Sequence, residues 1–254
     1  MINELFDVIR HAGEMIVNAR QFDVEIKEGH ANFVTTVDAA VEEYLKGELA
    51  RLCPDASFIG EEQENAPLGD EPTWIIDPID GTTNFIHDFR FSSISVALVE
   101  QGKPVLGAVY QPYTQEMFHA VRGEGAYLNG QRIHVKNMSF EQALVGFGTS
   151  PYNPELAEKS LQAALQFLLQ SSDIRRGGSA ALDLAYVAAG RQDIYFELLL
   201  KPWDYAAGAL LVEEAGGVFV MPRLAEPDYG RIEAVLAAAP SCYEDACRVL
   251  KPYW

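Results

Sequence analysis

Three apolar segments of this chain each end in carboxylates, and this pattern restricts the folds that the chain can adopt. The segments are Phe58-Ile59-Gly60-Glu61-Glu62, Trp74-Ile75-Ile76-Asp77-Pro78-Ile79-Asp80 and Lys201-Pro202-Trp203-Asp204. Acids that directly follow buried segments lie at the rim of a core, where an unpaired charge is expensive. A hard divalent cation compensates such charges, because magnesium prefers oxygen ligands. Most charged residues are solvated surface residues, so spacing alone leaves both a metal site and ordinary turn acids open.

The segment Asp77–Thr83 adds chemical detail to the second of these clusters. Pro78 disfavours helical geometry at Asp77, so two carboxylates can converge from either side of a turn. Gly81 permits a close approach of the backbone, and Thr82-Thr83-Asn84-Phe85 can begin a helix. Free amides at the beginning of a helix favour a bound phosphate. The segment therefore predicts metal ligands directly beside a phosphate site, which is an arrangement for phosphoryl chemistry.

Apolar periodicity divides the chain into two halves of different style. The first half predicts helices at 3–20 and 38–52, strands at 58–59, 74–76, 93–99, 105–110 and 116–121, and a hairpin with Asn129-Gly130 at its turn. The segment from Gln63 to Pro72 is polar and contains Pro67, Gly69 and Pro72, which predicts a surface loop. This half should be two helices followed by a largely antiparallel sheet.

The second half alternates strands and helices. It predicts strands at 144–147, 194–196 and 218–220, and helices at 153–170, 179–189 and 204–215, with Asn153 as the cap of the first helix. Such alternation is typical of a layered α/β structure. We expect residues 1–138 to form an α+β half with the metal motifs, and residues 139–254 to form an α/β half that completes the metal and substrate site.

The composition is strongly acidic, with 19 basic and 37 acidic residues and a net charge of −18. This balance argues against direct nucleic-acid binding, whose affinity comes from basic residues that neutralise phosphates. It would also repel a phosphate ester unless bound cations reversed the local field. We expect no membrane span and no secretory signal, and the three cysteines fit free thiols in a reducing cytoplasm.

Five motifs, in this order along the chain, closely resemble those of the inositol monophosphatase family. They are Thr35-Thr36-Val37-Asp38, Gly60-Glu61-Glu62, Asp77-Pro78-Ile79-Asp80-Gly81-Thr82-Thr83-Asn84-Phe85, Arg176-Gly177-Gly178-Ser179-Ala180-Ala181 and Trp203-Asp204-Tyr205-Ala206-Ala207-Gly208. The resemblance covers nearly the whole chain. It implies a layered α+β or α/β sandwich of the αβαβα type, as in fructose-1,6-bisphosphatase, and a magnesium-dependent, lithium-sensitive phosphatase that forms a homodimer.

The resemblance also implies a role for each residue that matches the family pattern. Two to three Mg²⁺ ions would be bound by Glu61, Asp77, the Ile79 carbonyl, Asp80 and Asp204. The catalytic residues would be Thr82 and Asp38, which orient and deprotonate water, together with Glu61 and with Lys27 beside the metals. The substrate would contact Asp80, Gly81, Thr82, Gly178, Ser179, Ala180, Glu197 and Asp204, with the amides of Gly81 and Thr82 on the phosphate.

The identity of the alcohol stays open at this stage. Inositol 1-phosphate is the leading substrate, and fructose 1,6-bisphosphate, histidinol phosphate and 3′-phosphoadenosine nucleotides are alternatives. Leu199 stands where relatives often have glycine, and Met221–Ala234 lacks the expected acidic and glycine pattern. A different class is a non-catalytic family member that binds transcription or RNA machinery, but the complete metal ligands and the Thr82–Asp38 pair argue against it.

Overall fold

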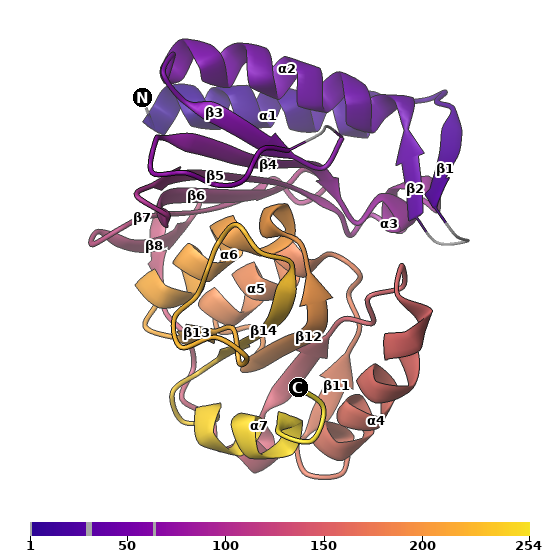
Figure 1. The fold of residues 1–254 in the computed structure, drawn as a ribbon, viewed down its shortest axis with the longest axis vertical. Helices are drawn as coiled ribbons and strands as arrows, with labels where there is room; N and C mark the ends of the chain where they lie inside the picture. The colour runs from indigo at the N-terminus through magenta and orange to yellow at the C-terminus, as the bar shows by residue number, and fades with distance from the viewer. Residues whose placement is uncertain (1, 29–31, 63–64) are drawn as a thin grey trace.

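The computed structural model describes residues 2–28, 32–62 and 65–254. Figure 1 shows five layers, in which helices and sheets alternate. Two helices, α1 (Ile2–Asn18) and α2 (Thr36–Leu52), cover one face of the first sheet. The central layer contains α5 (Ala180–Ala188) and α6 (Pro202–Glu214), and the second sheet separates it from α4 (Ala157–Leu168) and α7 (Tyr243–Leu250). The predicted αβαβα sandwich is confirmed.

The first sheet has seven strands in the order β3-β4-β5-β6-β7-β8-β9. The strands are β3 (Ser57–Gly60), β4 (Thr73–Asp80), β5 (Ser93–Glu100), β6 (Lys103–Gln111), β7 (Glu116–Val121), β8 (Gly125–Leu128) and β9 (Gln131–Ile133). All neighbouring pairs are antiparallel except β3 and β4, which are parallel. Asn129 and Gly130 form the turn between β8 and β9, as their sequence predicts, and both have positive φ.

The second sheet has five strands in the order β11-β10-β12-β14-β13. The strands are β10 (Leu144–Phe147), β11 (Asp173–Arg175), β12 (Ile194–Leu200), β13 (Val218–Val220) and β14 (Glu233–Ala238). Strand β10 is parallel to β11 and β12, whereas β14 is antiparallel to β12 and β13. The strand β12 is therefore central and buried on both faces, so side chains alternate between the two adjoining helical layers.

The helix α2 begins with a capping box that later matters for the site. The Thr35 hydroxyl accepts hydrogen bonds from the amides of Val37 and Asp38, and the Asp38 carboxylate accepts one from the Thr35 amide at 2.8 Å. Because these contacts satisfy amides that lack intrahelical partners, the box fixes both the start of the helix and the orientation of Asp38. Asp38 is fully buried.

Small residues allow the central helices to approach the first sheet and each other closely. A Cβ atom added at Gly107 of β6 would lie 2.9 Å from the Ala207 carbonyl oxygen, and one added at Gly208 would lie 2.6 Å from Leu184 Cβ. One hydrophobic cluster therefore includes residues of both sheets and of α5 and α6. Because the halves share this cluster, the division after residue 138 stays a prediction.

Several elements differ from the sequence-based expectations. The antiparallel pair β1 (Val24–Glu28) and β2 (Asn32–Thr35), the strands β11 and β14, and the helix α7 were not predicted. Asn153 is at the N-cap position of a 3₁₀ turn (Pro154–Leu156) that leads directly into α4, but its side chain makes no capping bond. Gln63, where the predicted loop begins, lies outside the described residues. Among the described helices, none is long and apolar enough to cross a membrane.

Candidate active site

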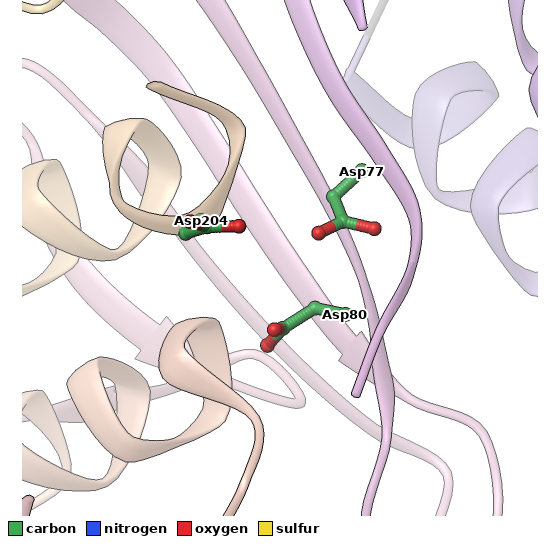
Figure 2. A group of neighbouring side chains, drawn as sticks. All are labelled: Asp77, Asp80 and Asp204. Carbon is green, nitrogen blue, oxygen red and sulfur yellow. The ribbon is translucent and has the colours of Figure 1, made fainter. Parts of the chain in front are cut away.

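Three aspartates from two layers converge at one end of β4. Asp77 and Asp80 lie in the last half of β4, and Asp204 lies in the first turn of α6. Each of the three offers one carboxylate oxygen such that these atoms all lie within 4.8 Å of one another. Figure 2 shows the three side chains directed toward a shared space between strand and helix. The structure thus brings together three of the four acids that the sequence proposes as metal ligands.

Hydrogen bonds fix each of these carboxylates. Asp77 Oδ1 accepts from the Ile79 amide at 3.0 Å, and Asp204 Oδ2 accepts from the Lys201 amide at 2.7 Å. The Asp80 carboxylate meets the beginning of α5, where Oδ1 accepts from the Ala180 amide at 3.2 Å and Oδ2 accepts from the Ala181 amide at 2.8 Å. These bonds orient the acids before any ligand is present.

The electrostatics of this group favour a cation. Burial raises the pKa of Asp77 well above its ordinary value, and the nearby carboxylates of Glu61, Asp80 and Asp204 raise it further. Burial likewise raises the pKa of Asp204, with further contributions from Asp80 and Glu61. Each shift means that negative charge is disfavoured here without compensation. An all-oxygen donor set with unfavourable excess charge fits Mg²⁺, which is a hard cation.

Glu61 lies outside the group of three and beside Lys27. The Lys27 ammonium is 3.4 Å from Glu61 Oε1 and forms an ion pair with Glu62. Burial lowers the pKa of Lys27. The carboxylates of Glu61 and Glu62 together outweigh this effect, so the pKa of Lys27 is raised above its ordinary value. Burial raises the pKa of Glu62 to about 7, against the effect of Lys27. Lys27 therefore lies beside Glu61 and Glu62, its expected place beside bound metals stays a prediction, and Glu62 has no role in the family pattern described above.

Thr82 and Asp38 come into contact although 44 residues separate them. Thr82 Oγ1 is 3.2 Å from Asp38 Oδ1 and 3.1 Å from the Ile79 carbonyl oxygen, and the hydroxyl can donate to one of them at a time. The other oxygen of Asp38 is occupied by Thr35 in the capping box. Burial raises the pKa of Asp38, and the Thr35 hydrogen bonds oppose this shift. The pair expected from the family resemblance is therefore present beside the aspartates.

Two adjoining cavities, of about 210 Å³ and about 80 Å³, open onto these residues. The larger one contains Glu61, Asp77, Ile79 and Asp204 in its wall, and the smaller one contains Arg176, Gly178 and Asp183. Both cavities share the following lining residues: Asp80, Gly81, Thr82, Pro151, Tyr152, Glu197, Leu200 and Asp204. The larger cavity thus brings several acids to one wall, and the smaller one adds the charged side chains of Arg176 and Asp183.

The expected substrate contacts are only partly free. The Ser179 hydroxyl and the Ala180 amide both donate to Asp80, so their hydrogens are already engaged. Gly178 has a φ of 88°, a left-handed conformation that favours glycine, and lines the smaller cavity. Gly81 has a φ of 93° and precedes the short helix α3 (Thr82–Ile86). Their positions agree with the proposed site, while their contacts with a ligand stay predictions.

Glu197 is more constrained than the sequence analysis anticipates. It lies on β12 and is 6% exposed, and its carboxylate accepts hydrogen bonds from Ser150 and Tyr195. Burial raises its pKa, and these donors oppose the shift. Neither donor belongs to the motifs that the sequence singles out, and nor does Asp183, which is 1% exposed and whose pKa burial raises to about 8. Ser150 contacts Glu197 across 47 residues, so no local motif links the two.

Comparisons with known proteins agree with this geometry. A model of the inositol monophosphatase family matches residues 1–253. The Nus factor SuhB of Xylella fastidiosa is 40% identical over 223 residues, which cover 85% of this chain and 80% of that protein. Inositol monophosphatase 2 of Solanum lycopersicum is 38% identical over 237 residues, which cover 89% of each chain.

Solved structures share the fold over almost the full length. The extragenic suppressor protein suhB from Bartonella henselae has a TM-score of 0.89 and 35% identity, with 98% of each chain covered. An IMPase/NADP phosphatase complexed with Mg²⁺ and phosphate has a TM-score of 0.83 and 26% identity, with 98% of this chain and 91% of that chain covered.

Proposed function

Because this chain belongs to the inositol monophosphatase family, we propose that it hydrolyses a small phosphate monoester with the help of magnesium. The observation that carries the proposal is the convergence of Asp77, Asp80 and Asp204 beside the Thr82–Asp38 pair. Two to three Mg²⁺ ions would be held by these aspartates, the Ile79 carbonyl and Glu61. Bound magnesium activates water and stabilises charge on the leaving oxygen. A structural relative is complexed with Mg²⁺ and phosphate, which supports the same ligand chemistry here.

The protein side chains would then position and deprotonate the nucleophile. The Thr82 hydroxyl donates to Asp38 and accepts from the attacking water, so that a proton of the water can pass toward Asp38. Asp38 cannot rotate away, because Thr35 holds its second oxygen. The amides of Gly81 and Thr82 would bind the phosphate, and Lys27 would limit the negative charge at Glu61. Positioned general bases contribute rate factors of about 10²–10⁴.

Inositol 1-phosphate is the proposed substrate, with Glu197, Gly178, Ser179 and Ala180 at the alcohol side. Fructose 1,6-bisphosphate, histidinol phosphate and 3′-phosphoadenosine nucleotides are the alternatives within the same chemistry. A structural relative named IMPase/NADP phosphatase supports keeping nucleotides among them. We also propose that the protein acts in the cytoplasm as a homodimer, in keeping with its free cysteines Cys53, Cys242 and Cys247.

A turnover screen tests the proposal directly. Protein dialysed against chelator is assayed for phosphate release from each of these esters and from p-nitrophenyl phosphate, with and without Mg²⁺ and with added Li⁺. We expect strict dependence on Mg²⁺, inhibition by Li⁺ and the highest kcat/KM for inositol 1-phosphate. Full activity in chelator would contradict the metal mechanism. Full activity in Li⁺ would contradict the expected lithium sensitivity.

Relatives named Nus factor SuhB favour a second candidate, a binding role in transcription. The same screen separates the two functions, because a pure binding protein turns over none of the esters. Inactivity of the wild type with every ester in saturating Mg²⁺ would therefore favour the binding role. The acidic net charge of −18 argues that such binding would be to protein and not directly to nucleic acid.

A further inference from the structure

The Glu197 carboxylate is held by two residues that the proposed function leaves unassigned. Glu197 and Tyr195 are two positions apart on β12, so both side chains point to the same face of the sheet. The Tyr195 hydroxyl donates to Glu197 Oε2 at 2.7 Å. Tyr195 is 1% exposed and belongs to the hydrophobic cluster of the central layer, so its ring is fixed by packing. The packed ring therefore holds the phenol hydroxyl in a fixed position beside the carboxylate.

Ser150 holds the other oxygen of the same carboxylate. Its amide donates to Glu197 Oε1 at 2.7 Å, and its hydroxyl is 3.2 Å from that oxygen and 2.9 Å from the Leu199 carbonyl oxygen. Ser150 has a φ of 42°, in the left-handed region that costs a non-glycine residue free energy. This conformation turns the amide toward Glu197, and the loop continues into Pro151 and Tyr152, which line both cavities.

Gly148 supplies the space that the carboxylate occupies. A Cβ atom added at this position would overlap the Glu197 carboxylate group, so only glycine leaves room for it. The Gly148 amide also donates to the Phe196 carbonyl at 3.0 Å, which ties this backbone to β12 beside Glu197. Glu197 is thus confined by a tyrosine, a loop amide and a glycine, and yet it lines both cavities.

We propose that Tyr195, Ser150 and Gly148 are positioning residues that determine alcohol specificity through Glu197. They hold its carboxylate in one orientation at the cavity wall, where it accepts a hydrogen bond from a hydroxyl group of the alcohol. A fixed acceptor discriminates against alcohols that cannot donate to it, because its acceptor position then stays unpaired. The inference rests on the proposed phosphatase function and concerns only how the leaving alcohol is selected.

The substitution Tyr195→Phe removes the phenol oxygen and keeps the packed ring. We expect kcat/KM for inositol 1-phosphate to fall about 3- to 30-fold, mainly through KM, which is the range of one hydrogen bond to a charged or neutral group. For p-nitrophenyl phosphate, whose leaving group has no further hydroxyl, the loss should be clearly smaller. Equal losses with both esters, or no loss with either, would overturn the proposal.

A matched control is Tyr229→Phe. Tyr229 is also buried and donates to a glutamate, Glu213 Oε1, at 3.0 Å, and neither residue lines the two cavities. It reports what deletion of a buried Tyr–Glu hydrogen bond does to the protein in general. Tyr229→Phe should leave the ratio of kcat/KM between the two esters unaltered. If Tyr229→Phe changes this ratio as well, the effect of Tyr195→Phe comes from a general loss of stability.

A double-mutant cycle identifies Glu197 as the residue through which Tyr195 acts. In a Glu197→Ala background, Tyr195→Phe should cause no further loss with inositol 1-phosphate, since coupled residues are not additive. The independent variant Gly148→Ala, which displaces the carboxylate without deleting a bond, should produce the same selective loss. Additive losses in the cycle, or a Gly148→Ala variant with unchanged selectivity, would refute the proposal. Absence of wild-type turnover with every ester would instead refute the phosphatase function itself.

Discussion

The substitution Asp77→Asn removes one charge from the acidic group with little other change. Asp77 Oδ1 accepts from the Ile79 amide, and an asparagine oxygen can keep this bond while its nitrogen replaces the second oxygen. The corresponding change at Asp80 is less clean, because both of its oxygens accept hydrogen bonds from the beginning of α5. Asp77 is 1% exposed, so its charge is poorly screened.

The expected stabilisation follows from the geometry. Two unit charges 4.8 Å apart repel by about 3.5 kcal/mol at an effective dielectric constant of about 20, and Asp77 has two such neighbours. The raised pKa of Asp77 and Asp204 means that protonation relieves part of this repulsion. We therefore expect metal-free Asp77→Asn to be more stable than the wild type by about 2 kcal/mol, a Tm increase of about 4–8 °C.

Magnesium should abolish most of this difference. The wild type gains about 2.7 kcal/mol when Mg²⁺ is at a hundredfold excess over its Kd, and the variant, lacking a ligand, should gain under about 1 kcal/mol. Thermal melts of both proteins with chelator and with Mg²⁺ measure these differences. Asp55→Asn, at an exposed position in the turn after α2, is the control for loss of a single charge. Equal Tm values in chelator together with equal gains from Mg²⁺ would refute the proposed metal site.

Two further substitutions test other parts of the site. Thr82→Val removes the hydroxyl beside Asp38 and should lower kcat by about 10²–10⁴. The Mg²⁺-dependent rise in Tm should persist. A variant with full kcat would exclude the proposed Thr82–Asp38 pair. Asp183→Asn keeps an acceptor for Gln192 and removes a carboxyl whose pKa burial raises to about 8. Because folded Asp183 retains its proton up to about pH 8, the wild type should lose up to about 1.4 kcal/mol of stability per pH unit between pH 5 and 8. Urea unfolding in chelator should show the advantage of Asp183→Asn growing over this range, and parallel pH profiles would contradict the assignment.

The fold was predictable where the pattern of burial is regular. The strand β4 is buried along its full length, so its apolar run gives a clear signal, and Asn129-Gly130 marks its hairpin by turn chemistry alone. The strand β14 was not predicted because its sequence, Glu-Ala-Val-Leu-Ala-Ala, has no alternation: it is buried on both faces between β12 and β13. The pair β1 and β2 was missed because both strands are short and their described side chains are mostly exposed or only partly buried.

The site was predictable to the extent that its ligands lie in compact motifs. Asp77 and Asp80 share one strand end, whereas Asp204 joins them only because α6 begins against β4. The contacts of Glu197 with Ser150, 47 residues away, depend on the positive φ of Ser150. A serine in the sequence does not predict this backbone conformation. Asp183 lies within a helix that is otherwise apolar nearly all round, and its burial is decided by the packing of that helix against the second sheet.

The close approach of Gly107 to Ala207 connects a position outside the site to the spacing of the proposed metal ligands. Ala207 is one turn of helix beyond Asp204, so the gap between β6 and α6 sets how far Asp204 stands from Asp77. A methyl group at position 107 meets backbone and cannot be absorbed by a rotating side chain. We therefore expect Gly107→Ala to change the spacing of the proposed ligands as well as the packing, and Mg²⁺ titration of this variant should show weakened binding in a protein whose acids are all intact.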